Sequence, residues 1–111
     1  MQLILVYITT KDKTQAEQIG KKLVEEKLVG CVNILDGMKS IYWWNDAIQE
    51  DSEAILLAKT DQNLLPGLIS RVKQLHSYSC PCIIALPIIE GNPDYLKWLK
   101  QQIHCSENPD R

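Results

Sequence analysis

The order of apolar and polar residues near the start of the chain predicts a strand followed by a helix. The apolar and β-branched run at residues 3–9 has the length of a buried strand. Apolar residues then recur every three or four positions, which predicts a helix over about residues 13–28. Asp12 and Thr14 each precede a Gln or Glu by three residues, so either can cap this helix, and Gly30 is expected to end it.

A long hairpin is predicted after this helix. A strand over residues 31–44 is interrupted at Gly37, where we expect a bulge or bend. A turn at Asn45 and Asp46 leads into a second strand that returns to residue 60. Two tryptophans and a tyrosine at the tip of such an arm would be exposed on a monomer, so we interpret the hairpin as an oligomerisation arm.

The second half of the chain predicts a helix, a strand and a final helix. Asp61 or Asn63 can cap the first of these helices, which is expected to end near His76. The continuous apolar run at residues 83–89 predicts a central strand covered on both faces. A last short helix follows Asn92-Pro93-Asp94, and its predicted inward residues are Tyr95, Leu96, Trp98, Leu99 and Ile103.

The order of these elements defines the expected fold class. Strand, helix, strand, strand, helix, strand and a C-terminal helix form the split βαβ arrangement of ferredoxin-like α+β domains. We expect a single domain over residues 1–105 and a polar, frayed tail at residues 106–111. Both helices should cover one face of the sheet, and the other face, which is partly apolar, should be covered by oligomerisation.

Composition narrows the class of protein. The chain has 111 residues, of which 45% are apolar and 23% charged, as in ordinary globular domains. No apolar run approaches the ~18 residues that span a bilayer, so no membrane association is expected. The first apolar run lacks the flanking features of a signal peptide, and we therefore expect a cytoplasmic protein.

Charge and cysteine content exclude further classes. The net charge is −2 and no basic block occurs, which argues against a nucleic-acid partner. An RNA-binding sheet of this fold would also need aromatic residues on its central strands, and residues 53–60 and 83–89 contain none. The four cysteines are too few and too unevenly spaced for a disulfide framework, and we expect reduced thiols.

An ordered set of short segments makes the chain similar to a known family. The segments are Thr9-Thr10-Lys11-Asp12, Leu28-Val29-Gly30-Cys31-Val32-Asn33, Ser40-Ile41-Tyr42-Trp43-Trp44, Glu53 with Lys59-Thr60, His76-Ser77-Tyr78 with Pro81, and Tyr95-Leu96-Lys97-Trp98-Leu99. Together they resemble the CutA family, which is named for divalent cation tolerance. The resemblance implies a homotrimer whose long hairpins pair between neighbours, similar in architecture to the PII-type signalling proteins, and a link to copper and other divalent metals.

The resemblance also implies a ligand site. Six residues match positions that the family tends to keep, near a cleft between subunits: Tyr42, Trp44, Glu53, Lys59, His76 and Tyr78. A carboxylate, an ammonium, an imidazole and two phenols suit a small polar or anionic ligand or a metal ion. The alternative is that Glu53 and Lys59 pair across subunits while Tyr42 and Trp44 pack the interface.

The sequence does not predict an enzyme. No nucleophile stands at a fixed spacing from a base. An acylphosphatase-like hydrolase would need an arginine in the loop after the first strand, and a copper chaperone would need a Cys-x-x-Cys motif there. Residues 9–13 contain neither. A hydrolase or another enzyme that uses the intersubunit cleft remains the alternative function.

A metal site is the second candidate, and its ligands would be His76, Cys80 and Cys82. The two thiols alternate with Pro81, so in extended backbone both face one side and can reach one copper or other divalent ion. Cys82 stands where the family pattern has a glutamate, which moves the expected preference toward softer ions. The alternative is that these cysteines, like Cys31, only fill space in the core.

Overall fold

Every predicted strand and helix is present in the structure, a computed structural model that describes residues 1–104. In chain order the elements are β1 (Leu3–Thr10), α1 (Lys13–Glu25), β2 (Cys31–Trp44), β3 (Ala47–Asp61), the 3-10 helix η1 (Gln62–Leu64), α2 (Leu65–Leu75), β4 (Ile83–Pro87) and α3 (Pro93–His104). The predicted tail at residues 106–111 lies outside the described residues. Across residues 1–104, no helix is both long enough and apolar enough to cross a membrane.

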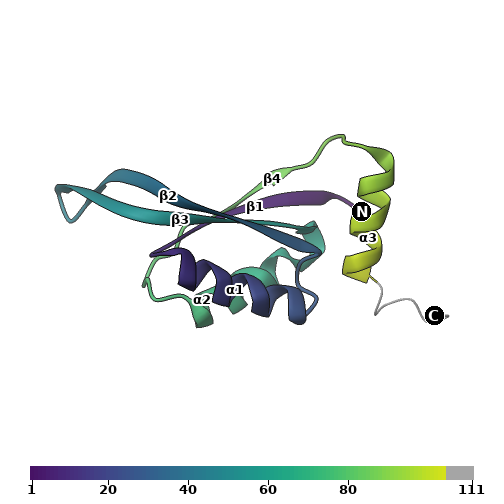
Figure 1. Cartoon of the computed structure of the whole chain (residues 1–111), viewed down its shortest axis with the longest axis horizontal. Helices are drawn as coiled ribbons and strands as arrows, with labels where there is room; N and C mark the ends of the chain where they lie inside the picture. Colours follow the sequence, from purple (N-terminus) through teal and green to yellow (C-terminus); the bar gives the residue numbers. More distant parts are fainter. Residues whose placement is uncertain (105–111) are drawn as a thin grey trace.

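The strands form one antiparallel sheet in the order β2-β3-β1-β4. Helices α1 and α2 lie against one face of this sheet (Figure 1). Val6, Ile8 and Leu56 point from the strands toward these helices and are fully buried, together with Ile19 and Leu68 from the helices. This is the ferredoxin-like α+β architecture that the order of elements predicts.

The prediction for the last strand was wrong in its position. In the described part of the chain β4 is an edge strand that pairs with β1 alone, and Ile84 and Leu86 remain 55% and 52% exposed. A continuous apolar run fits a central strand and an edge strand equally well when the outer face of the edge strand is apolar. The central strands are therefore β1 and β3. An RNA-binding sheet would carry several aromatic residues on these two strands, whereas Tyr7 is the single aromatic residue on them.

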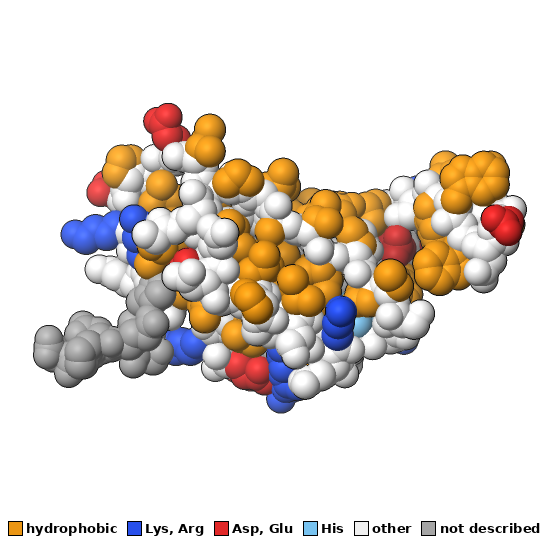
Figure 2. Space-filling view, turned by 180° about the vertical axis from the view of Figure 1, so that it is seen from behind, with side chains coloured by type: hydrophobic (Ala, Val, Ile, Leu, Met, Phe, Trp, Pro, Cys, Tyr) orange, Lys and Arg blue, Asp and Glu red, His pale blue; other side chains and the backbone are white. Residues whose placement is uncertain are grey.

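The face of the sheet opposite α1 and α2 is rich in apolar side chains. Leu35 is 55% exposed, and Ile84 and Leu86 lie on the same face because they pair with Tyr7 and Leu5 of β1. Viewed from behind, hydrophobic side chains gather over the middle of the molecule and again at the end of the hairpin (Figure 2). Contiguous apolar surface of this kind marks interaction sites on soluble proteins.

Helix α1 begins at the first of its two predicted caps and ends earlier than predicted. Asp12 is the cap, since its Oδ1 accepts a hydrogen bond of 2.8 Å from the Gln15 amide. The helix ends at Glu25 rather than near residue 28 because Lys27 adopts a left-handed backbone with φ 61°. The amides of Lys27 and Leu28 then donate to the carbonyls of Val24 and Leu23, which is a Schellman motif closed by a lysine.

Gly30 therefore has a role different from the predicted helix stop. A Cβ added at Gly30 would lie 2.6 Å from Leu99 Cδ1 and 3.1 Å from Ile103 Cγ1, so the missing side chain makes room for α3. Leu99 and Ile103 are buried as predicted, at 0% and 2% exposure, beside Leu3. Tyr95 and Trp98 do not pack inward: they are 36% and 43% exposed, because the buried stripe of α3 is narrower than its apolar composition suggests.

The β2–β3 hairpin extends beyond the body of the domain and gives it a long axis of 54 Å, against 27 and 21 Å for the other two (Figure 1). The predicted bulge lies between Leu35 and Met38, with Gly37 at φ 78°. The predicted turn is also present, with Asn45 and Asp46 both at positive φ, as a type I′ hairpin turn requires.

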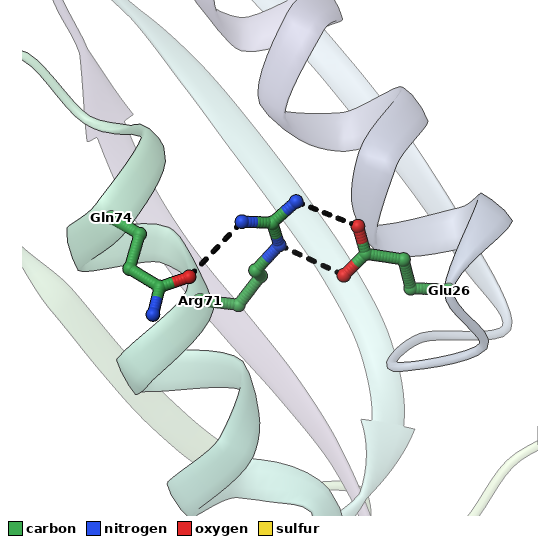
Figure 3. A network of polar contacts seen from close by, with 3 residues as sticks. All are labelled: Glu26, Arg71 and Gln74. Carbon is green, nitrogen blue, oxygen red and sulfur yellow. Dashed lines mark hydrogen bonds and ion pairs between the residues drawn. The ribbon is translucent and has the colours of Figure 1, made fainter.

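Helices α1 and α2 are joined at the surface by a charged contact. The Arg71 guanidinium donates two hydrogen bonds of 2.8 Å to the Glu26 carboxylate and a third of 3.0 Å to Gln74 (Figure 3). Arg71 holds the pKa of the Glu26 carboxyl below its usual value. At the other end of α2, neither predicted cap is confirmed. Leu64 occupies the cap position of α2 and makes no side-chain cap hydrogen bond, while Asp61 caps the preceding η1 by accepting from the Asn63 amide.

Candidate functional site

A pocket of about 660 Å³ lies where the hairpin leaves the body of the domain. Strands β1, β2 and β3 and the segment after α2 contribute to it. Of the residues predicted from the sequence, six line the pocket: Tyr42, Trp44, Glu53, Tyr78, Cys80 and Cys82. A smaller hollow of about 460 Å³ at the hairpin tip has Asp46 as its single charged side chain, so we place the candidate site in the larger pocket.

Two tyrosine–carboxylate pairs give the pocket its polar character. Tyr78 Oη donates a hydrogen bond of 2.8 Å to Glu53 Oε2, and Tyr42 Oη donates to Asp51 Oδ2. Burial and the Glu53 carboxylate raise the pKa of Tyr78 far above its ordinary value, and the bond to Asp51 raises the pKa of Tyr42. Both phenols therefore stay protonated and act as hydrogen-bond donors.

His76 supports the pocket without lining it. Its ring is buried, with Nε2 2.8 Å from the Thr9 carbonyl and Nδ1 accepting a 3.0 Å hydrogen bond from the Tyr78 amide. Since a carbonyl can only accept, Nε2 carries the proton and the imidazole is neutral. The ring also packs against that of Tyr78, with centroids 4.6 Å apart. His76 thus fixes the backbone and ring of Tyr78, and neither ring nitrogen has a lone pair left for a metal.

Cys80 and Cys82 line the pocket, but His76, the third predicted metal ligand, does not. Cys80 is exposed and Cys82 is half-buried. Burial and the nearby Glu53 carboxylate raise the pKa of Cys82, which favours its protonated form. Within residues 1–104, no three His, Cys, Asp or Glu side chains come together in an arrangement that could hold a metal ion.

Lys59 lies away from the other predicted ligand residues. It follows Glu53 by six residues on β3, a separation of about 20 Å along an extended strand. Lys59 is the register partner of Cys31, and its Nζ donates a 3.0 Å hydrogen bond to Tyr95 Oη. Cys31 Sγ lies 3.5 Å from the same hydroxyl. The contact with Tyr95 raises the pKa of Lys59, so this ammonium is part of the docking of α3.

Several pocket residues escaped the sequence prediction. Tyr7, Lys11, Ser40 and Asp51 all contribute to the lining. The alternation of a strand could have identified Asp51, because it precedes Glu53 by two residues and so shares its face. Lys11 enters the pocket from the loop after β1, and only the tertiary structure brings that loop to the hairpin.

Comparisons with known proteins agree with this fold. The family model described as CutA1 divalent ion tolerance protein matches residues 4–102. A divalent-cation tolerance protein CutA from Thermus thermophilus is 50% identical over 97 residues, covering 87% of this chain and 94% of that protein. The chloroplastic CutA 1 protein of Oryza sativa is 44% identical, and the chain spans 55% of its length, as it spans about half of other plant and animal relatives.

Solved structures give the same result. A divalent cation tolerance protein (Cut A1) from Thermus thermophilus superposes with a TM-score of 0.87 at 48% identity, covering 90% of this chain and 97% of that one. CutA1 from Oryza sativa superposes with a TM-score of 0.89 at 42% identity, covering 92% and 94%. Because the family model spans nearly all of the described residues and both of these solved CutA1 structures share the fold, this protein belongs to the CutA1 divalent ion tolerance protein family.

Proposed function

We propose that this protein acts in the tolerance of divalent metal ions, with copper the first candidate, by binding a metal ion or a small ligand in the pocket at the base of the hairpin. The observation that carries the proposal is the convergence of Glu53, Tyr42, Tyr78 and two thiols in one pocket beside an uncovered apolar sheet face. Relatives named divalent-cation tolerance proteins support the biological role.

The working form in this proposal is a homotrimer with the architecture of PII-type signalling proteins. Leu35, Ile84 and Leu86 leave more than half of their surface exposed in one chain, and Trp43 at the hairpin tip is 71% exposed. Burial of such apolar area is the main favourable term in association. A neighbouring chain that packs on this face would border the open side of the pocket and turn it into an intersubunit cleft.

Metal binding in the proposal depends on the thiols. Cys80 and Cys82 are soft ligands suited to copper(I) or zinc, and Glu53 lies close enough to Cys82 to raise its pKa. His76 can join them only by giving up its hydrogen bond to Thr9 or to the Tyr78 amide. This cost makes the two thiols the better part of the predicted metal ligands, and the Glu53 carboxylate is the ligand we add to them.

We favour a binding protein over an enzyme. The thiols of the pocket would need a base to become nucleophiles at neutral pH. His76 carries an imidazole beside the pocket, but both of its nitrogens are engaged in hydrogen bonds. A cytoplasmic location is also part of the proposal, and cell fractionation tests it, since relatives include proteins named chloroplastic and periplasmic.

Native mass spectrometry of the reduced protein, with and without copper and zinc, tests the proposal. We expect a trimer that takes up whole numbers of ions per chain and loses them when Cys80 and Cys82 are both replaced by serine. Cys31→Ser is the matched control, because Cys31 lies beside Lys59 and outside the pocket. A trimer that stays free of metal would contradict the metal-binding part, and a monomer at micromolar concentration would contradict the architecture.

The interface has its own test. Leu86→Asp places a charge on the apolar sheet face at an edge-strand position that is 52% exposed, so it should not disturb the core of one chain. We expect the native mass to shift from trimer to monomer with an unchanged circular dichroism spectrum. Glu90→Lys, an exposed charge change just beyond β4, is the control. A trimer that persists in Leu86→Asp would place the interface elsewhere.

A further inference from the structure

We propose that the natural ligand class of the pocket is a small organic cation, a primary ammonium on a short carbon chain, held between the carboxylates of Asp51 and Glu53. This inference rests on the proposed function, because it concerns the same pocket, and it deepens that function by naming the chemistry of the ligand. Charge, hydrogen-bonding capacity and the aromatic lining each lead to it.

The pocket carries an excess of negative charge. Asp51 and Glu53 lie two residues apart on β3 and share one face of the strand, and both line the pocket. Glu53 is only 7% exposed, yet within residues 1–104 neither carboxylate forms an ion pair with a lysine or arginine. Lys11 is the single cationic side chain in the lining. A buried carboxylate without a paired cation is unfavourable, and a bound cation would compensate it.

Hydrogen-bonding capacity is also left over. Each ionised carboxylate can accept about four hydrogen bonds, and among the described residues each of these two accepts one from a tyrosine hydroxyl. The tyrosines cannot neutralise the charge, because a protonated phenol is uncharged, and the raised pKa values of Tyr42 and Tyr78 keep both in that form. An ammonium group, with three donors and a positive charge, matches acceptors of this kind.

The remaining lining suits the carbon part of such a ligand. Tyr7, Tyr42, Trp44 and Tyr78 contribute aromatic surface to the pocket. Aromatic faces attract ammonium groups and pack against alkyl chains. A cavity of about 660 Å³ is far larger than a bare ion needs, and it lies within the range of small-molecule sites. An anionic ligand would meet two carboxylates and a single lysine, so of the expected ligand classes we favour a cation over an anion.

The test is titration calorimetry of the intact protein with n-butylammonium chloride. The neutral probe n-butanol and the anionic probe n-butyrate are similar in size to n-butylammonium and serve as controls for charge. We expect saturable binding of n-butylammonium, no saturation by the other two, and at least tenfold weaker binding in Glu53→Gln. The glutamine keeps the carbonyl that accepts from Tyr78 and removes only the charge. Equal binding of butyrate, or full affinity in Glu53→Gln, would overturn the proposal.

Two further variants make the result specific. Glu50→Gln removes the same charge from the same strand, but Glu50 pairs with Lys39 and lies outside the pocket, so it should leave the affinity within twofold. Asp51→Asn, at an exposed position, gives a second test if Glu53→Gln fails to fold. We expect at least a fivefold loss in Asp51→Asn, and an unchanged affinity there would contradict the two-carboxylate arrangement.

Failure of this inference and failure of the metal proposal give different results. Uptake of copper or zinc without binding of n-butylammonium would overturn the organic-cation inference and leave the metal proposal standing. Binding of n-butylammonium by a trimer that takes up no metal would support the inference and contradict metal binding. If Cys80→Ser/Cys82→Ser keeps its affinity for n-butylammonium, the carboxylates bind the cation without the thiols, as we infer.

Discussion

Gly30→Ala should destabilise the protein by about 1–2 kcal/mol, because it forces α3 away from the sheet. The new Cβ would lie 2.6 Å from Leu99 Cδ1 and 3.3 Å from the Leu99 carbonyl oxygen. Leu99 is fully buried among Leu3, Ile103 and Leu96, so it cannot move aside freely. Overpacking of this kind costs about 1–3 kcal/mol, and the stiffer unfolded chain returns about 0.4–1 kcal/mol.

Urea denaturation followed by circular dichroism, at one protein concentration for all variants, measures the effect. Gly67→Ala on α2 is the matched control: its Cβ would meet only Leu28 Cδ2 at 3.7 Å, and we expect a gain of about 0.5–1 kcal/mol. Leu99→Val in the Gly30→Ala background should recover part of the loss, since it removes a methylene at the clash. Equal stability of Gly30→Ala and wild type would show that the close packing of α3 is not what selects glycine.

Three further predictions concern titration, the hairpin turn and the surface. The raised pKa of Tyr78 means that the folded state keeps a proton that the unfolded state releases near pH 10, so the free energy of unfolding should fall as pH rises above 10. Tyr78→Phe should flatten this fall, and equal slopes would contradict the assignment. Asp46→Gly should stabilise the turn by about 0.5 kcal/mol in urea denaturation, because Asp46 has φ 61°, and a loss of stability would argue against a type I′ turn. Arg71→Ala should lower thermal stability slightly at low salt and not at high salt, since its partner Glu26 is at the surface; a salt-independent loss would indicate a packing role.

The sequence predicted the elements well because their signals are local. A capping residue, a Gly at a bulge and an Asn-Asp turn each act within a few residues, and Asp12, Gly37 and Asn45 behave as expected. The predictions that failed depend on distant neighbours. Nothing local in residues 83–89 tells an edge strand from a central one. A glycine after a helix usually ends it, but the residue that requires glycine at position 30 is Leu99, about seventy positions later in the chain.

The candidate site was predicted in part for the same reason. The resemblance to the family identified Glu53, Tyr42 and Tyr78, which converge in one pocket. The resemblance also placed Lys59 in this group, because a match of family positions says nothing about the distances between them. In the structure Lys59 lies beside Tyr95 instead. Nor could the resemblance reveal that His76 is saturated with hydrogen bonds, since that depends on the Thr9 carbonyl of another element.

The bulge at Gly37 sets the phase of the whole arm. Before it, odd-numbered residues of β2 such as Leu35 point to the face that lacks α1 and α2; after it, Met38 pairs with Glu53, so even-numbered residues do. Tyr42 and Trp44 therefore reach the pocket, and Trp43 points the other way. If the bulge closed instead by a one-residue slip of β2 along β3, Gly37 would stand opposite Glu53 and the two faces of the arm would be exchanged without changing any residue in it. One glycine, distant from the ligand residues, thus decides which aromatic rings the pocket contains.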